Sequence, residues 1–188
     1  MSPFMPVMPE GGFTLDDLDA LPEGQVRAEL TDGALTISPA PTRLHQYIAG
    51  SLCLRLSEAA TGMMSATWGT EIRLAASLTR IPDVLVLRSR EPDRRWFSPS
   101  NVLLAVEVES PGHHVEERIT RPALYAEFGI EHYWRIETDD DQFVAVVHAL
   151  RDGRYAEVSR GCRIEVAEPF TFRVDLEELR PQWARREW

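Results

Sequence analysis

Acidic side chains occur at two places where a soluble core rarely accepts them. Asp83 interrupts a dense run of aliphatic residues at 81–87, and Glu107 and Glu109 end a second apolar run at 102–109. Residues two apart in a strand point to the same face, roughly 6.5 to 7 Å from each other, so Glu107 and Glu109 share a side. If the two runs form neighbouring strands, Asp83 and Glu107 come within a few ångströms.

Carboxylates that meet at buried strand ends repel each other unless a positive charge lies between them. Mg²⁺ supplies such a charge, prefers hard oxygen ligands, and needs only one or two carboxylates besides waters and phosphate oxygens. A bound Mg²⁺, or Mn²⁺ in its place, polarises a phosphate and lowers the pKa of an attacking water. The alternative is that Asp83 is an ordinary turn acid and that Glu107 and Glu109 are solvent-facing charges.

The elements around these acids can be read from local patterns. A capped helix over 15–21 precedes a hairpin over 26–38, whose Asp32-Gly33 pair is typical of a type I′ turn. Pairing across this turn places Leu30 opposite Leu35 and leaves Glu29 on the other face. Apolar residues at helical spacing predict a long helix over 42–60.

Strands and one more helix account for the rest of the chain. The pattern predicts a helix that runs into Gly129, strands over 63–74, 81–87, 102–109, 132–136, 143–150, 155–158, 163–166 and 170–174, and a helical turn near 176–179. This order predicts an α/β (α+β) domain with a central mixed β-sheet flanked by helices. We expect a flexible N-terminal arm over 1–12 and a single domain over 13–188.

The composition is that of a soluble globular protein. Among 188 residues, 20 basic and 30 acidic side chains give a formal net charge of −10. This charge argues against a general nucleic-acid binder, whose affinity comes from neutralised phosphates, but not against an enzyme that binds nucleic acid transiently. Cys53 and Cys162 are too few for a cysteine zinc site, and they suit a reducing cytoplasm, where we expect the protein.

A series of short motifs runs through the chain in a specific order. They are Arg27-Ala28-Glu29-Leu30 with Asp32-Gly33, Pro39-Ala40-Pro41, His45-Gln46, Ile81-Pro82-Asp83-Val84, Val106-Glu107-Val108 with Ser110-Pro111, Leu124-Tyr125 and Glu131-His132-Tyr133-Trp134. Together, over about residues 13–180, they resemble the Uma-type family of restriction endonucleases, within the PD-(D/E)XK nuclease superfamily.

The resemblance implies a restriction-endonuclease-like core with α-β-β-β-α-β order. Asp83 matches the PD aspartate of the family and Glu107 its second acid, so that both would hold Mg²⁺. Glu29 matches the glutamate of the early hairpin motif. His45 falls on a polar position near the start of the first long helix and would line the same cleft. A capping or surface histidine is the alternative for His45.

The usual catalytic lysine is missing, because every basic residue of the chain is arginine. The superfamily pattern has lysine where this chain has Glu109, and the family often places it in the next helix, where this chain has Arg121, before Tyr125. Arginine keeps the positive charge and could stabilise a developing phosphorane, but its pKa above ~12 makes it a poor base. Pro122 disfavours helical geometry at Arg121. Arg121 is either a functional substitute or a mark of lost activity.

Two functions from different classes follow. The first is a Mg²⁺-dependent endonuclease that binds DNA transiently and hydrolyses phosphodiester bonds. Its candidate residues are Asp83 and Glu107 on the metal, Arg121 on the phosphate, and Glu29, Glu109, His45 and Tyr125 around them. The second is a catalytically inactive binding or regulatory module, in which Asp83→Ala relieves repulsion and stabilises the protein. A sugar or nucleotide hydrolase has none of its usual motifs here.

Three further features of the sequence could have a functional role. The arginine-bearing loop over 88–95 is a candidate phosphate contact, with a solvated loop as the alternative. His113 and His114 follow a Ser-Pro-Gly turn and are interpreted as loop residues. Trp183 and Trp188 could serve the interface of a homodimer, although single exposed aromatic residues also occur without a partner.

Overall fold

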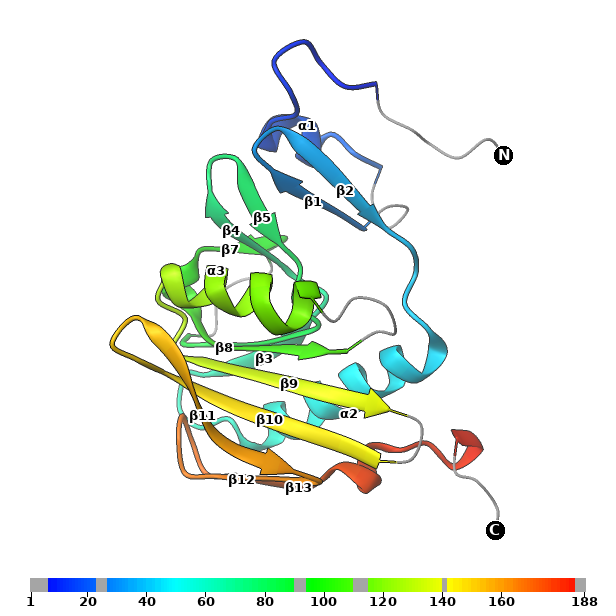
Figure 1. The fold of residues 1–188 in the computed structure, drawn as a ribbon, viewed down its shortest axis with the longest axis vertical. Helices are drawn as coiled ribbons and strands as arrows, with labels where there is room; N and C mark the ends of the chain where they lie inside the picture. The colour runs from blue at the N-terminus through cyan, green and yellow to red at the C-terminus, as the bar shows by residue number, and fades with distance from the viewer. Residues whose placement is uncertain (1–6, 23–26, 90–93, 110–114, 140–141, 185–188) are drawn as a thin grey trace.

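A computed structural model describes residues 7–22, 27–89, 94–109, 115–139 and 142–184. Its centre is a six-stranded sheet in the order β11-β10-β9-β8-β6-β3 (Figure 1). These strands are β3 (Ser65–Trp68), β6 (Val84–Leu87), β8 (Val102–Val108), β9 (His132–Asp139), β10 (Gln142–Arg151) and β11 (Arg154–Gly161). β8 and β9 are parallel, and the other neighbouring pairs are antiparallel. The predicted mixed sheet is confirmed.

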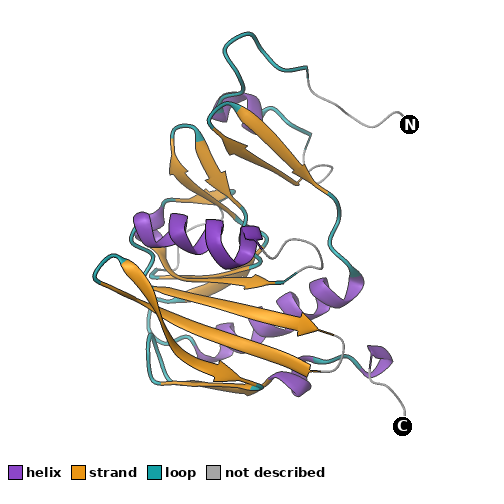
Figure 2. Ribbon diagram, in the orientation of Figure 1, coloured by secondary structure: helices purple, strands orange, loops and turns teal. Residues whose placement is uncertain are grey.

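Helices cover the two faces of this sheet (Figure 2). α2 (Arg43–Ala59) lies on one face and begins at Thr42, whose hydroxyl accepts a hydrogen bond from the His45 N–H at 3.3 Å. α3 (Arg121–Glu127) lies on the other face and follows a π-helical turn, η2 (Glu116–Thr120). No helix in the described part of the chain is long and apolar enough to span a membrane.

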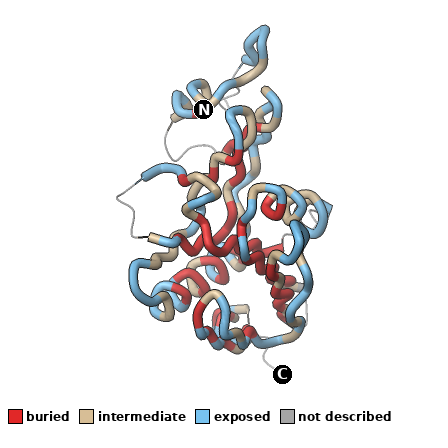
Figure 3. Tube along the Cα trace, turned by 90° about the vertical axis from the view of Figure 1, so that its left-hand side faces the viewer, coloured by how far each residue is buried: buried red, intermediate tan, exposed pale blue. Residues whose placement is uncertain are grey.

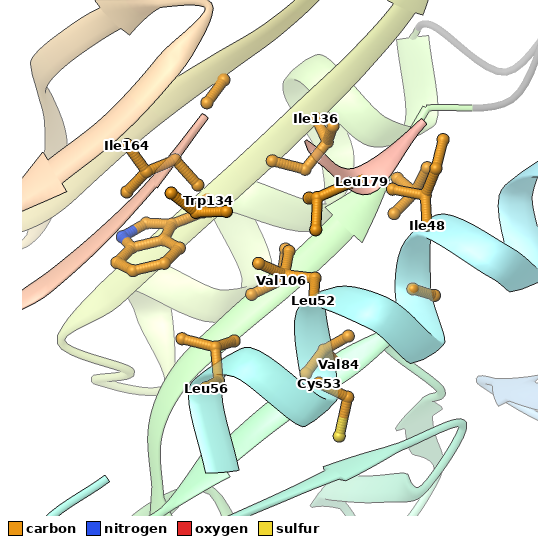
Figure 4. Close-up of a cluster of buried hydrophobic side chains, with 14 of the residues drawn as sticks. Ile48, Leu52, Cys53, Leu56, Val84, Val106, Trp134, Ile136, Ile164 and Leu179 are labelled. Atoms are coloured by element: carbon orange, nitrogen blue, oxygen red, sulfur yellow. The ribbon is translucent and has the colours of Figure 1, made fainter. Parts of the chain in front are cut away.

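The main core lies between α2 and the sheet. Ile48, Leu52 and Leu56 recur every four residues and so face the sheet together, where all three are fully buried. Figure 4 shows Leu52 beside Val106, Leu56 on the side of Trp134, and Ile48 near Leu179. The cluster continues to β12 (Arg163–Val166), β13 (Phe172–Asp175) and the short helix η3 (Leu176–Leu179). Another short helix, η4 (Gln182–Ala184), follows.

A second sheet extends the molecule at its N-terminal end (Figure 1). Its strand order is β2-β1-β5-β4-β7, formed by β1 (Arg27–Thr31), β2 (Ala34–Ser38), β4 (Glu71–Ala75), β5 (Leu78–Arg80) and β7 (Trp96–Phe97). In the chain, the short helix α1 (Leu15–Asp19) precedes β1, and the short helix η1 (Pro99–Asn101) follows β7. Figure 3 shows the buried segments concentrated in the interior of the molecule and the exposed ones around them.

The predicted hairpin is confirmed in its register. Leu30 pairs with Leu35 and Glu29 with Thr36. Asp32 and Gly33 have φ values of 47° and 83°, which is the left-handed geometry that a type I′ turn requires.

The prediction of one strand over 63–74 is wrong. The segment forms two strands in different sheets, β3 and β4. Gly69, with φ of 61°, separates them, and its N–H donates to the backbone carbonyl of Asp83 at 3.1 Å. The chain therefore turns from the main sheet to the second sheet directly beside Asp83.

Candidate active site

Asp83 and Glu107 lie side by side at the ends of neighbouring strands, as the sequence predicted. Val84 pairs with Val106 across β6 and β8, and the N–H of Asp83 donates to the Val106 carbonyl at 3.1 Å. Asp83 is 6% exposed and Glu107 3% exposed. Two carboxylates are thus buried together where the two sheets meet.

Asp83 is held by three donors. Its Oδ2 accepts the backbone N–H of Val108 at 2.8 Å and lies 3.1 Å from His45 Nε2, and its Oδ1 accepts Arg27 Nη2 at 3.3 Å. Burial opposes ionisation, but the His45 hydrogen bond and the charges of His45 and Arg27 outweigh it and hold the pKa of Asp83 below its usual range. Burial works against the charged form of His45 too, and Asp83 still raises the pKa of His45. Asp83 is therefore ionised.

Glu107 has the opposite electrostatic character. Burial raises the pKa of Glu107 to about 7, against the charge of Arg121, and the nearby Asp83 adds to the rise. Its Oε1 accepts the Tyr125 hydroxyl at 2.7 Å and Arg121 Nη1 at 3.1 Å. Glu107 consequently titrates close to neutral pH.

The guanidinium group of Arg121 lies between two carboxylates. Arg121 Nη2 donates to both oxygens of Glu29 at 2.9 Å, while Nη1 bonds Glu107 and lies 3.3 Å from the Tyr125 hydroxyl. Glu29 Oε1 also accepts the N–H of Ile81 at 2.7 Å. The positive charge that the buried acids require is supplied here by an arginine side chain.

The expectation that Pro122 disfavours helical geometry at Arg121 is wrong. Arg121 has φ of −61° and ψ of −49°, and α3 continues through it. Pro122 occupies the first turn of α3, where a missing N–H is tolerated, and the preceding turn is of the wider π type. This arrangement lets Arg121 reach Glu29 and Glu107 from the start of the helix.

Glu109 belongs to a different cluster. It shares a side of the sheet with Glu107, but its carboxylate contacts the guanidinium of Arg118 and lies 3.2 Å from Arg135 Nε. Arg135 also donates to Glu137 at 2.7 Å, so the charges continue along β9 away from Asp83. These contacts therefore place the Glu109 carboxylate with Arg118 and Arg135 rather than with the candidate metal ligands.

Of the sequence-predicted residues, the structure brings together Asp83, Glu107, Arg121, Glu29, His45 and Tyr125. Sequence reasoning missed Arg27 as a partner of Asp83, although strand alternation places Arg27 on the same side as Glu29. In the arginine-bearing loop, Arg88 pairs with Glu131 at 2.9 Å. Residues 90–93, His113, His114 and Trp188 lie outside the described residues.

The donor set fits Mg²⁺ in its chemistry. Asp83 and Glu107 offer two hard carboxylates, which is the number that Mg²⁺ commonly takes from a protein. Within the described residues, Glu107 uses Oε1 for its hydrogen bonds and leaves Oε2 without one, and the contact of Asp83 with Arg27 is long at 3.3 Å. Among the described residues there is no group of three or more histidine, cysteine or acidic side chains with the arrangement of a metal site. Water and substrate oxygens would therefore complete the shell.

The fold, with its mixed central sheet, is similar to that of a solved structure. A crystal structure from Anabaena variabilis, titled “a putative nuclease belonging to DUF820”, superposes with a TM-score of 0.68 at 16% identity, covering 89% of this chain and 97% of that one. The model of the Uma2 family, described as “putative restriction endonuclease”, matches residues 15–178. The chain belongs to the Uma2 family. No curated protein matches it.

Proposed function

We propose that this protein is a Mg²⁺-dependent endonuclease that hydrolyses phosphodiester bonds in DNA. The observation that carries the proposal is the side-by-side burial of Asp83 and Glu107 on paired strands, at the junction of the two sheets. Membership of a family described as restriction endonucleases supports the reaction class and the nucleic-acid substrate.

Asp83 and Glu107 would hold the metal ion through their carboxylate groups. When bound, Mg²⁺ supplies polarisation of the phosphate and a water of lowered pKa. Glu107 must lose its proton to act as a ligand, and its pKa of about 7 places that step near neutral pH.

The surrounding residues orient these two acids. His45, Arg27 and the Val108 N–H fix the carboxylate of Asp83, and Tyr125 fixes that of Glu107. Glu29 holds Arg121 by two hydrogen bonds, so that a permanent positive charge stays beside Glu107. In this position Arg121 offsets negative charge that develops on a phosphate, whereas it cannot act as a base.

Cleavage of supercoiled plasmid tests the proposal. Wild type should convert the plasmid to nicked or linear forms with Mg²⁺ or Mn²⁺ and not with EDTA, and Asp83→Asn should abolish the conversion. The matched control is Asp16→Asn, an exposed acid in the first turn of α1, which should cleave like wild type. Wild type that leaves the plasmid intact with either metal, or Asp83→Asn that cleaves normally, would contradict the proposal.

A catalytically inactive binding module is the second candidate. The contact that favours it is the bridging position of Arg121, because a guanidinium group already neutralises Glu29 and Glu107. In that case the plasmid stays intact while the fold remains stable without metal.

A further inference from the structure

A cavity of about 180 Å³ lies directly beside the candidate active site. Ile81 and Gly69 both line it, and both also bond the site: the Ile81 N–H donates to Glu29, and the Gly69 N–H donates to the Asp83 carbonyl. Ile81 precedes Asp83 by two residues. A molecule with its phosphate at Asp83 could therefore extend its next group into this cavity.

The cavity combines apolar side chains with the charged side chains of Asp19, Glu71, Arg73 and Arg95. Its apolar lining comes from α1, the segment after it and β1, through Leu18, Leu21, Pro22 and Ala28. Glu71 and Arg73 of β4 are charged, and a hydrogen bond of 2.6 Å from Arg73 Nε to Glu71 Oε1 joins them. Their side chains are only 15% and 12% exposed.

Glu71 and Arg73 each keep one polar side-chain atom without a hydrogen bond among the described residues. Within the described residues, Arg73 uses Nε and Nη2 for its hydrogen bonds, and Glu71 uses Oε1. Arg73 Nη1 and Glu71 Oε2 are thus a donor and an acceptor without a described hydrogen bond, on two residues that line the cavity. The Arg73 guanidinium also lies 4.6 Å from the centre of the Trp96 ring, which fixes its plane.

We propose that this cavity binds a nucleobase of the substrate strand. A base presents donors and acceptors along one planar edge and apolar faces above and below, and enzymes that hold an unstacked base read the edge by hydrogen bonds and pack its faces. The Glu71–Arg73 pair matches the edge, and the Leu21 and Ala28 walls match the faces. The neighbouring phosphate position rests on the proposed function.

Titration of the four deoxynucleoside 5′-monophosphates in EDTA, followed by NMR, tests the cavity without any metal. The reporter is the indole N–H signal of Trp96, assigned with Trp96→Phe. At least one nucleotide should shift this signal saturably in the wild type. Glu71→Gln should weaken that binding by at least about tenfold, since one good base contact accounts for roughly 1 to 3 kcal/mol. The matched control Glu165→Gln, at an exposed position of β12, should bind within about twofold of wild type.

Leu21→Trp gives a second variant, which adds bulk to the cavity lining without changing its charge and should abolish the shift. Absence of a saturable shift for all four nucleotides, or equal binding by Glu71→Gln or Leu21→Trp and wild type, would overturn the proposal. Since no metal is present, nucleotide binding together with an intact plasmid would leave the cavity assigned and refute only the hydrolysis. Plasmid cleavage without nucleotide binding would support the hydrolysis and refute the binding of a base in the cavity.

Discussion

Arg121 and Glu29, which are 92 positions apart in the chain, are joined by two hydrogen bonds of 2.9 Å from one guanidinium nitrogen to both carboxylate oxygens. Glu29 belongs to β1 of the second sheet, and Arg121 begins α3 on the face of the main sheet. The pair therefore ties the two sheets together beside Asp83 and Glu107.

Removing Arg121 should strongly destabilise the fold. Arg121→Ala leaves Glu29 and Glu107 without their positive neighbour, and breaking a buried pair on one side costs about 3 to 5 kcal/mol. Arg121→Lys should cost less, because it keeps the charge but not the two-fold contact with Glu29. Urea denaturation followed by circular dichroism measures both.

Arg163→Ala is the matched control for these variants, because Arg163 pairs with Asp175 at 2.9 Å on an exposed surface. Its cost should stay below about 1 kcal/mol. An Arg121→Ala protein as stable as the Arg163→Ala protein would show that the bridge does not tie the sheets together.

Glu107 should make stability fall as pH rises. Its pKa is about 7 in the folded protein and near 4.5 when unfolded, so the folded state binds more protons between these two values. Stability from this group is present below pH 4.5 and is lost as pH rises towards 7. Glu107→Gln, which resembles the protonated form, should lack this loss.

Urea denaturation in EDTA at pH 4.5 and at pH 7.5 measures the effect. Relative to that of Glu107→Gln, the free energy of unfolding of the wild type should be lower at pH 7.5 than at pH 4.5, by ~1 kcal/mol or more. A difference that is the same at both values would mean that Glu107 titrates normally.

Asp83→Ala should destabilise the protein, contrary to the sign expected from carboxylate repulsion alone. The lowered pKa of Asp83 shows that its partners stabilise its charge, and the substitution would leave Arg27, His45 and the Val108 N–H without an acceptor. The expected loss is about 1 to 3 kcal/mol or more. Thermal melting against the surface variant Asp16→Asn checks the direction, and a raised melting temperature would contradict it.

Glu109 should be dispensable for metal binding, because its carboxylate is held by Arg118 and Arg135 rather than lying beside Asp83. Electron paramagnetic resonance of Mn²⁺ should show Glu109→Gln binding within about twofold of wild type, whereas Glu107→Gln should bind at least about tenfold more weakly. Equal losses in both variants would place Glu109 among the ligands.

Local patterns predicted the elements well where a single turn or helix face decides the outcome. The Asp32-Gly33 turn sets the register of Leu30 against Leu35, and the cap at Thr42 starts α2 where the pattern predicted it. The division at Gly69 was missed, because β3 and β4 differ only in the sheet that each joins. That choice depends on partners distant in sequence.

The candidate site follows the same distinction. The adjacency of Asp83 and Glu107 was predictable, since Asp83 interrupts one apolar run, Glu107 lies near the end of another, and the two runs pair as neighbouring strands. The Arg27 contact with Asp83 and the separation of Glu109 were not, because each depends on how a long arginine side chain reaches across from another element.

Calorimetric titration of Mg²⁺ into the wild type and into Glu107→Gln tests whether Asp83 and Glu107 form a metal site. We expect saturable binding by wild type and by the control Glu165→Gln, and loss of binding in Glu107→Gln, with all three proteins folded by circular dichroism. Wild type that binds neither Mg²⁺ nor Mn²⁺, or Glu107→Gln that binds as wild type does, would contradict a metal-dependent nuclease at Asp83 and Glu107.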